Sequence, residues 1–142
     1  MRSFAFALGL VFLLGGCPAP GTECGEDGEC LGGEVCTRDH VCAAPADVRR
    51  VWIEWRVRGI DPRAGGCFGV LELSVSFVDT SGTYDDHTYV PVPCPQGMFV
   101  VDRLSTRYDL VRVVAFDGNH TEIAGAEAAL TGSEALLSLD LR

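Results

Sequence analysis

The sequence contains no lysine, and all eleven of its basic residues are arginine. Against twenty acidic residues, this leaves a formal net charge of −9. Proteins that bind nucleic acid present a basic patch or stripe, and docking on anionic lipid also needs clustered cations. The composition therefore argues against nucleic acid as a partner and against electrostatic attachment to a membrane surface.

Motifs that carry familiar chemistry are also missing. The sequence has no G-x-S-x-G, H-E-x-x-H, P-loop or G-x-G-x-x-G pattern. Histidine occurs only as His40, His87 and His120, and we expect the last two to be exposed to solvent in turns or sheet edges. We assign no catalytic residue, cofactor or metal, and we predict that the protein is not an enzyme.

Long hydrophobic runs are scarce, and the one at the N-terminus is short. The apolar run 4–14 follows Arg2 and cannot span a bilayer, which takes about 20 residues. A positive residue, a short apolar stretch and small residues before a cysteine are the layout of a secretory leader. We therefore expect residues 1–16 to be a cleaved signal peptide.

Leu14-Gly15-Gly16-Cys17 resembles the lipobox of bacterial lipoproteins, which ends in an obligatory cysteine. The resemblance implies that Cys17 carries a diacylglyceryl group, becomes the first residue of the mature chain and is acylated with a fatty acid such as palmitate. Several acyl chains anchor a protein stably to a bilayer. Because Pro18 and not aspartate follows, the resemblance implies the bacterial cell envelope and its outer membrane. The alternative is an ordinary signal peptide with an incidental cysteine.

Seven cysteines are an odd number, and assigning Cys17 to lipid leaves six. In an exported chain, cysteines form disulfides that persist. Four of the six recur at a fixed interval within 23–43, and the other two lie in the following domain. The residues expected in disulfides are Cys24, Cys30, Cys36, Cys42, Cys67 and Cys94.

The four clustered cysteines could instead be metal ligands or free thiols. Structural zinc sites favour C-x(2–4)-C spacing, whereas every gap here is five residues, and His40 is awkwardly close to Cys42 for one tetrahedron. Disulfides are therefore favoured. Four cysteines allow three connectivities, and the spacing does not choose among them. We take the interleaved pairs Cys24–Cys36 and Cys30–Cys42 as the working hypothesis.

Residues 23–43 are too few to bury a core and need crosslinks to hold a shape. Their pattern resembles the small Cys-rich modules of Dickkopf N-terminal or EB type, with Gly32-Gly33 at the turn of those modules. By the same resemblance, such a module follows the lipobox in many surface lipoproteins, notably of myxobacteria. The carboxylates lack the spacing of a calcium loop, so solvated charge is favoured over calcium binding. They are Glu23, Glu26, Asp27, Glu29, Glu34 and Asp39.

Alternating apolar residues predict strands over most of 50–142, which we expect to be one domain joined by a linker at 44–49 to the module and its lipidated tether, 17–22. Pro91 and Pro93 place the strand at 84–93 on a sheet edge. Residues 121–130 fit either helix or strand. The side chains expected to point inward are Val51, Ile53, Trp55, Val57, Leu71, Leu73, Val75 and Phe77. The expected strands are 51–58, 69–79, 84–93, 98–104, 108–117 and 134–142.

Short strands at this spacing predict an all-β fold, a small antiparallel β-sandwich of six or seven strands. Cys67 precedes the second strand and Cys94 follows the third, so a disulfide would tie the ends of that hairpin, and a catalytic cysteine is the weaker alternative. Trp52 is on the outward face of the first strand. We expect it to pack on the second sheet, with an exposed aromatic contact as the alternative.

The segment 104–118, LSTRYDLVRVVAFDG, is similar to a run in transthyretin-like and carboxypeptidase-regulatory-like domains. The Trp-containing first strand, the GGC loop and the PCPQG segment also resemble myxobacterial lipoproteins. Thr106-Arg107 stands where such domains usually have glycine before the residue equivalent to Tyr108. The resemblance implies an accessory or binding module, and no catalytic residues carry over.

These features predict a membrane-anchored extracytoplasmic lipoprotein that acts as a non-catalytic binding or envelope-structural module. The expected partners are the membrane, through the lipid on Cys17, and a protein or glycan. The first alternative is a small inhibitor or ligand-capture protein that uses its Cys-rich loop. The second is a hydrolase whose triad is assembled across loops.

Overall fold

A computed structural model describes residues 23–132 and 134–141, so Cys17 and the expected signal peptide and tether lie outside the described residues. Strands dominate, joined by short 3-10 helices, and no helix in the described part of the chain is long and apolar enough to cross a membrane. The elements are η1 (Asp27–Glu29), β1 (Val35–Cys36), β2 (Cys42–Ala43), η2 (Pro45–Asp47), β3 (Val48–Val57), η3 (Pro62–Ala64), β4 (Glu72–Val78), β5 (His87–Val92), η4 (Cys94–Gln96), β6 (Met98–Ser105), β7 (Leu110–Phe116), β8 (Glu122–Ala129) and β9 (Glu134–Leu141).

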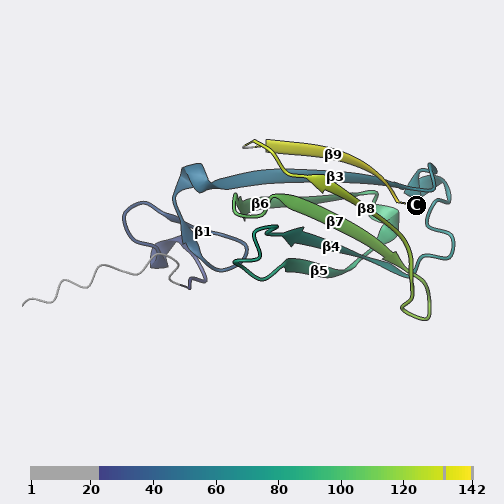
Figure 1. Cartoon of the computed structure of the whole chain (residues 1–142), viewed down its shortest axis with the longest axis horizontal. Helices are drawn as coiled ribbons and strands as arrows, with labels where there is room; N and C mark the ends of the chain where they lie inside the picture. Colours follow the sequence, from purple (N-terminus) through teal and green to yellow (C-terminus); the bar gives the residue numbers. More distant parts are fainter. Residues whose placement is uncertain (1–22, 133, 142) are drawn as a thin grey trace, which may run out of the picture.

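Two sheets form a sandwich, which confirms the predicted all-β fold. One sheet has the strand order β6-β3-β9, and the other has the order β5-β4-β7-β8. The small β1-β2 hairpin belongs to the Cys-rich module, which lies at one end of the long axis (Figure 1). The module and the sandwich are thus arranged end to end.

The strand pairing departs from the expected antiparallel pattern at β9. This strand pairs in parallel with β3, from Arg50 opposite Glu134 to Val57 opposite Leu141. The four-stranded sheet is antiparallel throughout. The side-chain alternation of a strand is the same beside a parallel or an antiparallel neighbour, so it cannot reveal this direction. The sandwich therefore contains one mixed sheet.

The first strand of the sandwich is longer than expected. Val48 and Arg49 already pair with Ser105 and Leu104 of β6, although 44–49 was predicted to be a linker. Only η2 separates this pairing from the β1-β2 hairpin. The module is therefore joined to the sandwich by a short, structured connection.

The core confirms most of the predicted inward positions. Val51, Ile53, Trp55 and Val57 are all buried on one face of β3. Leu71 was wrongly predicted to point inward, because β4 begins only at Glu72 and the Leu71 side chain is 54% exposed. The buried residues of the facing sheet include Leu73, Val75, Phe77, Val111, Val113 and Ala115.

Trp52 does not pack on the second sheet, as was expected. Its side chain is half-buried on the opposite face of β3 from the core residues, and the Arg50 guanidinium lies 5.5 Å from its ring centre. Strand side chains alternate between faces, so a residue next to the buried Val51 and Ile53 must point away from the core. The alternative, an aromatic on the outer face, describes its position better.

One further prediction about strands is confirmed, and one open alternative is decided by the structure. β5, which contains Pro91, is an edge strand of its sheet. The ambiguous segment 121–130 forms β8, paired along its length with β7. Gly125 and its alanine neighbours have weak strand propensity, so this pairing and the burial of Ala124 outweigh the local preference.

The third predicted disulfide, Cys67–Cys94, is present. It lies beside Trp55 near the C-terminal end of β3, whereas the module precedes the N-terminal end of that strand. Cys94 is buried, and its carbonyl accepts a hydrogen bond from Trp55 Nε1 at 3.1 Å. The loop before β4 is thereby fixed to the core strand β3. Both cysteines have a structural role.

Candidate functional site

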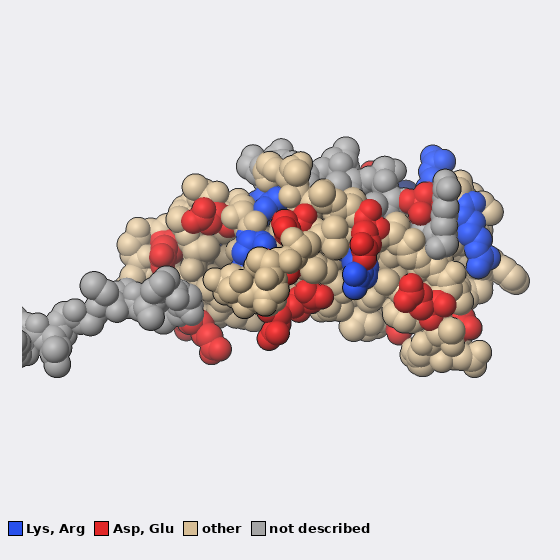
Figure 2. All heavy atoms as spheres, viewed as in Figure 1, with Lys and Arg blue, Asp and Glu red and all other residues tan. Residues whose placement is uncertain are grey.

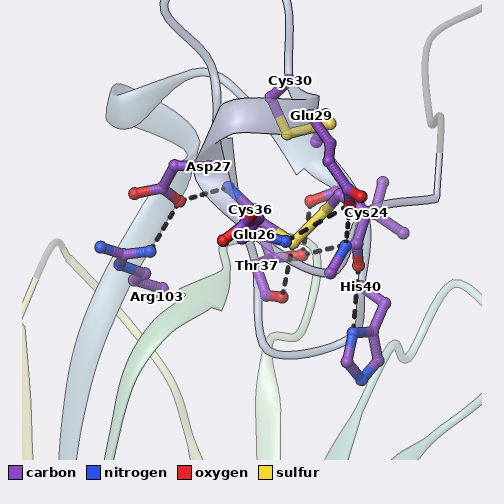
Figure 3. Close-up of a disulfide and its surroundings, with 12 residues drawn as sticks. Cys24, Glu26, Asp27, Glu29, Cys30, Cys36, Thr37, His40 and Arg103 are labelled. Atoms are coloured by element: carbon purple, nitrogen blue, oxygen red, sulfur yellow. Dashed lines mark hydrogen bonds and ion pairs between the residues drawn. A yellow bond between two sulfur atoms is a disulfide. The ribbon is translucent and has the colours of Figure 1, made fainter.

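The Cys-rich module is held by two disulfides. Cys24 pairs with Cys36 (Figure 3), and Cys30 pairs with Cys42, which are the interleaved pairs of the working hypothesis. The sulfur atoms of Cys24, Cys30 and Cys42 lie within 4.8 Å of one another, close enough to share a metal ion. Thiolates are the form of cysteine that binds metal, and a sulfur in a disulfide offers none. The two disulfides thus use the same atoms that a metal site would need.

His40 is not directed at these sulfur atoms. Its Nδ1 lies 3.1 Å from the carbonyl oxygen of Cys24, and its ring points away from the disulfides (Figure 3). Asp27 is similarly engaged, because its Oδ1 accepts from the Cys36 amide at 2.9 Å and from Arg103 Nη1 at 2.6 Å. The carboxylate of Asp27 therefore connects the module to β6 of the sandwich.

A second ion pair also joins the module to the sandwich, but here the module supplies the arginine and the sandwich supplies the carboxylate. Arg38 of the module donates through Nε to Asp102 Oδ1 at 2.8 Å. The hydrogen bond from Arg38 holds the pKa of Asp102 below its ordinary value. Both side chains are exposed, and exposed ion pairs contribute little free energy. Together with the Asp27–Arg103 pair, it therefore helps to orient the module on the sandwich but adds little to the free energy of folding.

The buried part of this boundary centres on Tyr108, which is 1% exposed. Its hydroxyl donates to Asp39 Oδ2 at 3.1 Å and accepts from Arg107 Nη2 at 2.9 Å. Arg107 also forms an ion pair with Asp39, whose side chain is only 5% exposed. Burial raises the pKa of Tyr108, so its hydroxyl stays protonated and able to donate. Removing one member of a buried pair leaves an uncompensated charge, so this contact ties the module firmly to the sandwich.

Arg107 is placed between two aromatic rings. Its guanidinium carbon lies 4.3 Å from the ring centre of Tyr84 and 4.9 Å from that of Tyr108. Burial opposes the charge on Arg107, but the hydrogen bond to Tyr108 and the negative charge of Asp39 raise its pKa above the ordinary value. Arg107 is therefore a fixed cation. Asp79 holds Tyr84 in place by accepting a hydrogen bond from its amide at 3.0 Å.

His87 was predicted to be exposed, but its side chain is partly buried. Its ring packs edge-on against Tyr89, with the ring centres 4.8 Å apart, and its Nε2 is buried without a hydrogen-bond partner. Burial lowers the pKa of His87, the charge of Asp39 raises it in part, and His40 and Arg107 lower it further. His87 is therefore a neutral imidazole beside the module. His120, in contrast, is exposed, as predicted.

A cleft of about 970 Å³ lies between the module and the sandwich. Its walls come from both, including Val41 to Ala43 of the module and Tyr84 to His87 and Ser105 to Tyr108 of the sandwich. The acidic residues that line it are Glu23, Glu34, Asp39, Asp47, Asp85 and Asp86. Arg107 is the only arginine in this lining. Figure 2 shows that acidic side chains also outnumber basic ones over the visible face of the molecule.

The cleft offers carboxylates, a fixed guanidinium and aromatic rings. These groups suit recognition of a polar ligand.

Searches of family models, curated proteins and solved structures found no match for this chain. The cleft therefore has to be understood from its own geometry. Sequence reasoning had treated Asp39 as solvated charge, Thr106-Arg107 as a deviation at a turn, and His87 as exposed. The one available signal was Arg107 itself, a charged residue directly before the strand predicted from Tyr108.

Proposed function

We propose that the protein is an extracytoplasmic lipoprotein, anchored in the bacterial cell envelope through lipid on Cys17, that serves as a non-catalytic binding module. The lipobox-like segment before Cys17 supports the anchor. The three disulfides of the folded chain suit an oxidising compartment outside the cytoplasm. The acidic surface suits attachment by lipid more than by charge.

The observation that carries the binding role is the cleft itself. Asp39 and Arg107 come from the module and the sandwich, and their ion pair closes the floor between the two parts. A passive spacer would need no such buried polar contact between its parts. Ligand sites commonly form at the junction of two structural units, and a rigid junction lowers the entropic cost of binding.

The position of the cleft relative to the anchor follows from the chain order. The expected tether, 17–22, directly precedes Glu23, which lines the cleft. The binding surface would then be at the membrane-proximal end, and the C-terminal end of β3, beside the Cys67–Cys94 disulfide, would be farther from the anchor. A partner held at this cleft would itself be close to the membrane surface.

Lipid labelling tests the anchor. Cells expressing the full chain are grown with radiolabelled palmitate, and the membrane and soluble fractions are compared for wild type and Cys17→Ser. We expect label and membrane attachment for wild type and neither for the variant. Equal labelling of both, or an unlabelled wild-type protein in the soluble fraction, would refute the proposal.

One observation favours the alternative role as an inhibitor that acts through the Cys-rich loop. Leu31 is 63% exposed and lies between the disulfide-bonded Cys30 and the Gly32-Gly33 turn. A rigid loop with an exposed apolar tip is a suitable anchor for a partner pocket. A photo-cross-linking residue placed at 31 or at 85 in intact cells separates the two roles, because an adduct formed only from position 31 would favour the inhibitor.

A further inference from the structure

We propose that the outer face of the sheet β6-β3-β9 binds a second copy of this chain, with a two-fold axis passing through Trp52. This dimer goes beyond the binding role of the cleft, because the residues that carry it, on β3 and β6, do not line the cleft. Two observations support it, which are the apolar character of the face and the order of the charges along β3.

Exposed apolar side chains gather on the outer face of β3 and β6. Trp52 is half-buried and points away from the core, and the strand pairing places Val100 beside it. Val100 is 43% exposed, and Met98, which the same pairing places beside Glu54, is 41% exposed. Side chains two residues apart in a strand share a face, so Met98 and Val100 are neighbours on β6. Together with Trp52 they form an apolar patch that is accessible to solvent.

The outer face of the other sheet is polar, and its side chains pair with one another. Ser76 Oγ lies 2.8 Å from Thr88 Oγ1 across β4 and β5, and Arg112 of β7 forms an ion pair with Glu127 of β8. A sheet with one face on the core commonly presents such a polar face to water. The apolar patch on β3 and β6 departs from this pattern, and exposed apolar patches commonly mark interaction surfaces.

The charges on either side of Trp52 identify a second copy as the partner. Arg50 and Glu54 lie two positions before and after Trp52, on the same face of β3, and both are exposed. Neither forms an ion pair with a side chain that the structure describes. If two β3 strands pack antiparallel across a two-fold axis at Trp52, each Arg50 faces Glu54 of the other copy. A parallel arrangement would instead oppose like charges, so the charge order selects the antiparallel one.

The geometry of packed sheets allows this contact. Sheets that pack face to face cross at about 30°, and a strand rises about 3.3 Å per residue, so Arg50 and the opposing Glu54 would be offset sideways by about 3 Å. The long side chains of arginine and glutamate can span such an offset. Glu54 and Met98 also line a groove of about 350 Å³, which leaves room for an incoming guanidinium. The antiparallel arrangement places the two Cys-rich modules at opposite ends of the dimer (Figure 1).

The size of the face predicts a weak dimer. The ten residues of β3 extend over about 33 Å, and the three strands of the sheet cover about 14 Å in width. Two copies would therefore bury about 900 Å² in total, which is in the range of transient interfaces. We expect the association to be reversible and to depend on protein concentration.

Sedimentation equilibrium of the full-length chain tests the dimer, in a non-ionic detergent whose density is matched by the solvent so that only protein contributes to the mass. Concentrations from about 10 to about 500 µM suit a transient interface. The variants are Trp52→Ser, Arg50→Glu and Glu54→Arg. Leu31→Ser is the matched control, because it removes a side chain that is 63% exposed but belongs to the module. Equal melting temperatures of the variants and wild type establish that all are folded.

We expect wild type and Leu31→Ser to form dimers, and Trp52→Ser to dimerise about 30-fold more weakly, as for an aromatic at the centre of an interface. Arg50→Glu and Glu54→Arg should each dimerise about ten-fold more weakly, because like charges then face each other. An equimolar mixture of these two variants should regain the wild-type affinity, since the mixed dimer opposes unlike charges at both contacts.

A wild-type protein that stays monomeric over this concentration range would overturn the inference and leave the face to a different partner. Charge variants that dimerise like wild type would also overturn it, as would a mixture that associates no better than its components. Equal weakening by Leu31→Ser and Trp52→Ser would mean that the association is non-specific, which contradicts the proposed interface.

Discussion

The hydroxyl of Tyr108 donates a hydrogen bond to Asp39 Oδ2 over 3.1 Å, and the two residues belong to different parts of the molecule. Tyr108 comes just before β7 of the sandwich, while Asp39 lies in the turn between the two strands of the Cys-rich module. Arg107 bonds to both. A small crosslinked module has no core of its own, so its orientation depends on contacts of this kind.

Replacing Tyr108 by phenylalanine should weaken the attachment of the module. The change leaves Asp39 buried with one donor fewer, and a hydrogen bond to a charged group contributes about 1.5–3 kcal/mol. Urea unfolding should show a loss of this size, and hydrogen exchange should show faster exchange within 24–42. Tyr89→Phe is the control, because the Tyr89 hydroxyl has no hydrogen-bond partner among the described residues. Equal losses in both variants would contradict the role of the Tyr108 hydroxyl.

The pKa of His87 predicts a pH dependence of stability. Burial lowers this pKa in the folded protein, with Asp39 opposing and His40 and Arg107 assisting. The unfolded chain then binds a proton more readily, so stability is complete above about pH 6.5 and falls as the pH drops toward the folded pKa. His87→Gln should flatten the unfolding free energy between about pH 7 and about pH 5. A wild-type slope in His87→Gln would contradict the assignment of this pH dependence to His87.

The disulfide between Cys67 and Cys94 closes a long loop, with a sequence separation of 27. Removing it with Cys67→Ser/Cys94→Ser should lower the free energy of unfolding by about 3.5 kcal/mol, because the unfolded chain gains freedom. Urea unfolding of the oxidised proteins measures the difference. A loss below about 1 kcal/mol would mean that the loop is fixed mainly by contacts such as that between Trp55 Nε1 and the Cys94 carbonyl.

Gly66 is expected to tolerate no side chain. A Cβ at this position would lie 2.5 Å from the carbonyl oxygen of Ile60 and 2.9 Å from that of Asp61. Since both neighbours are backbone atoms, Gly66→Ala should destabilise the fold by about 1–3 kcal/mol. Gly118→Ala is the matched control, because nothing lies within 4 Å of its Cβ. Thermal unfolding of the two variants compares them directly, and equal midpoints would contradict the packing described for this loop.

Local pattern in the sequence was sufficient to predict most of the strands and most of their buried positions. Val51, Ile53 and Trp55 alternate with polar residues, and alternation depends only on which face meets the core. The same pattern could not reveal that β9 runs parallel to β3, because direction depends on how the chain crosses between sheets. Leu71 shows the other limit, since the alternation continues past the point where strand pairing starts.

The candidate site could be predicted only in part. Disulfide bonding of the cysteines followed from their spacing and the expected compartment, whereas the interleaved connectivity was a working hypothesis that the structure confirms. The cleft could not be predicted, because Asp39 and Arg107 are far apart in the chain and meet only when the module docks on the sandwich. The burial of His87 has the same origin. A contact between two segments that are distant in the chain cannot be predicted from the local sequence of either segment alone.

Intact mass spectrometry of the membrane-extracted protein, alkylated before any reduction, tests the anchored and oxidised state most directly. We predict a chain that begins at Cys17, carries the mass of a diacylglyceryl group and a further acyl chain, and contains no alkylated cysteine. Reduction before alkylation should then label each of the cysteines from Cys24 to Cys94 while the lipid remains. A chain that retains residues 1–16 and is alkylated without reduction would contradict both the lipid anchor and the disulfide-bonded module.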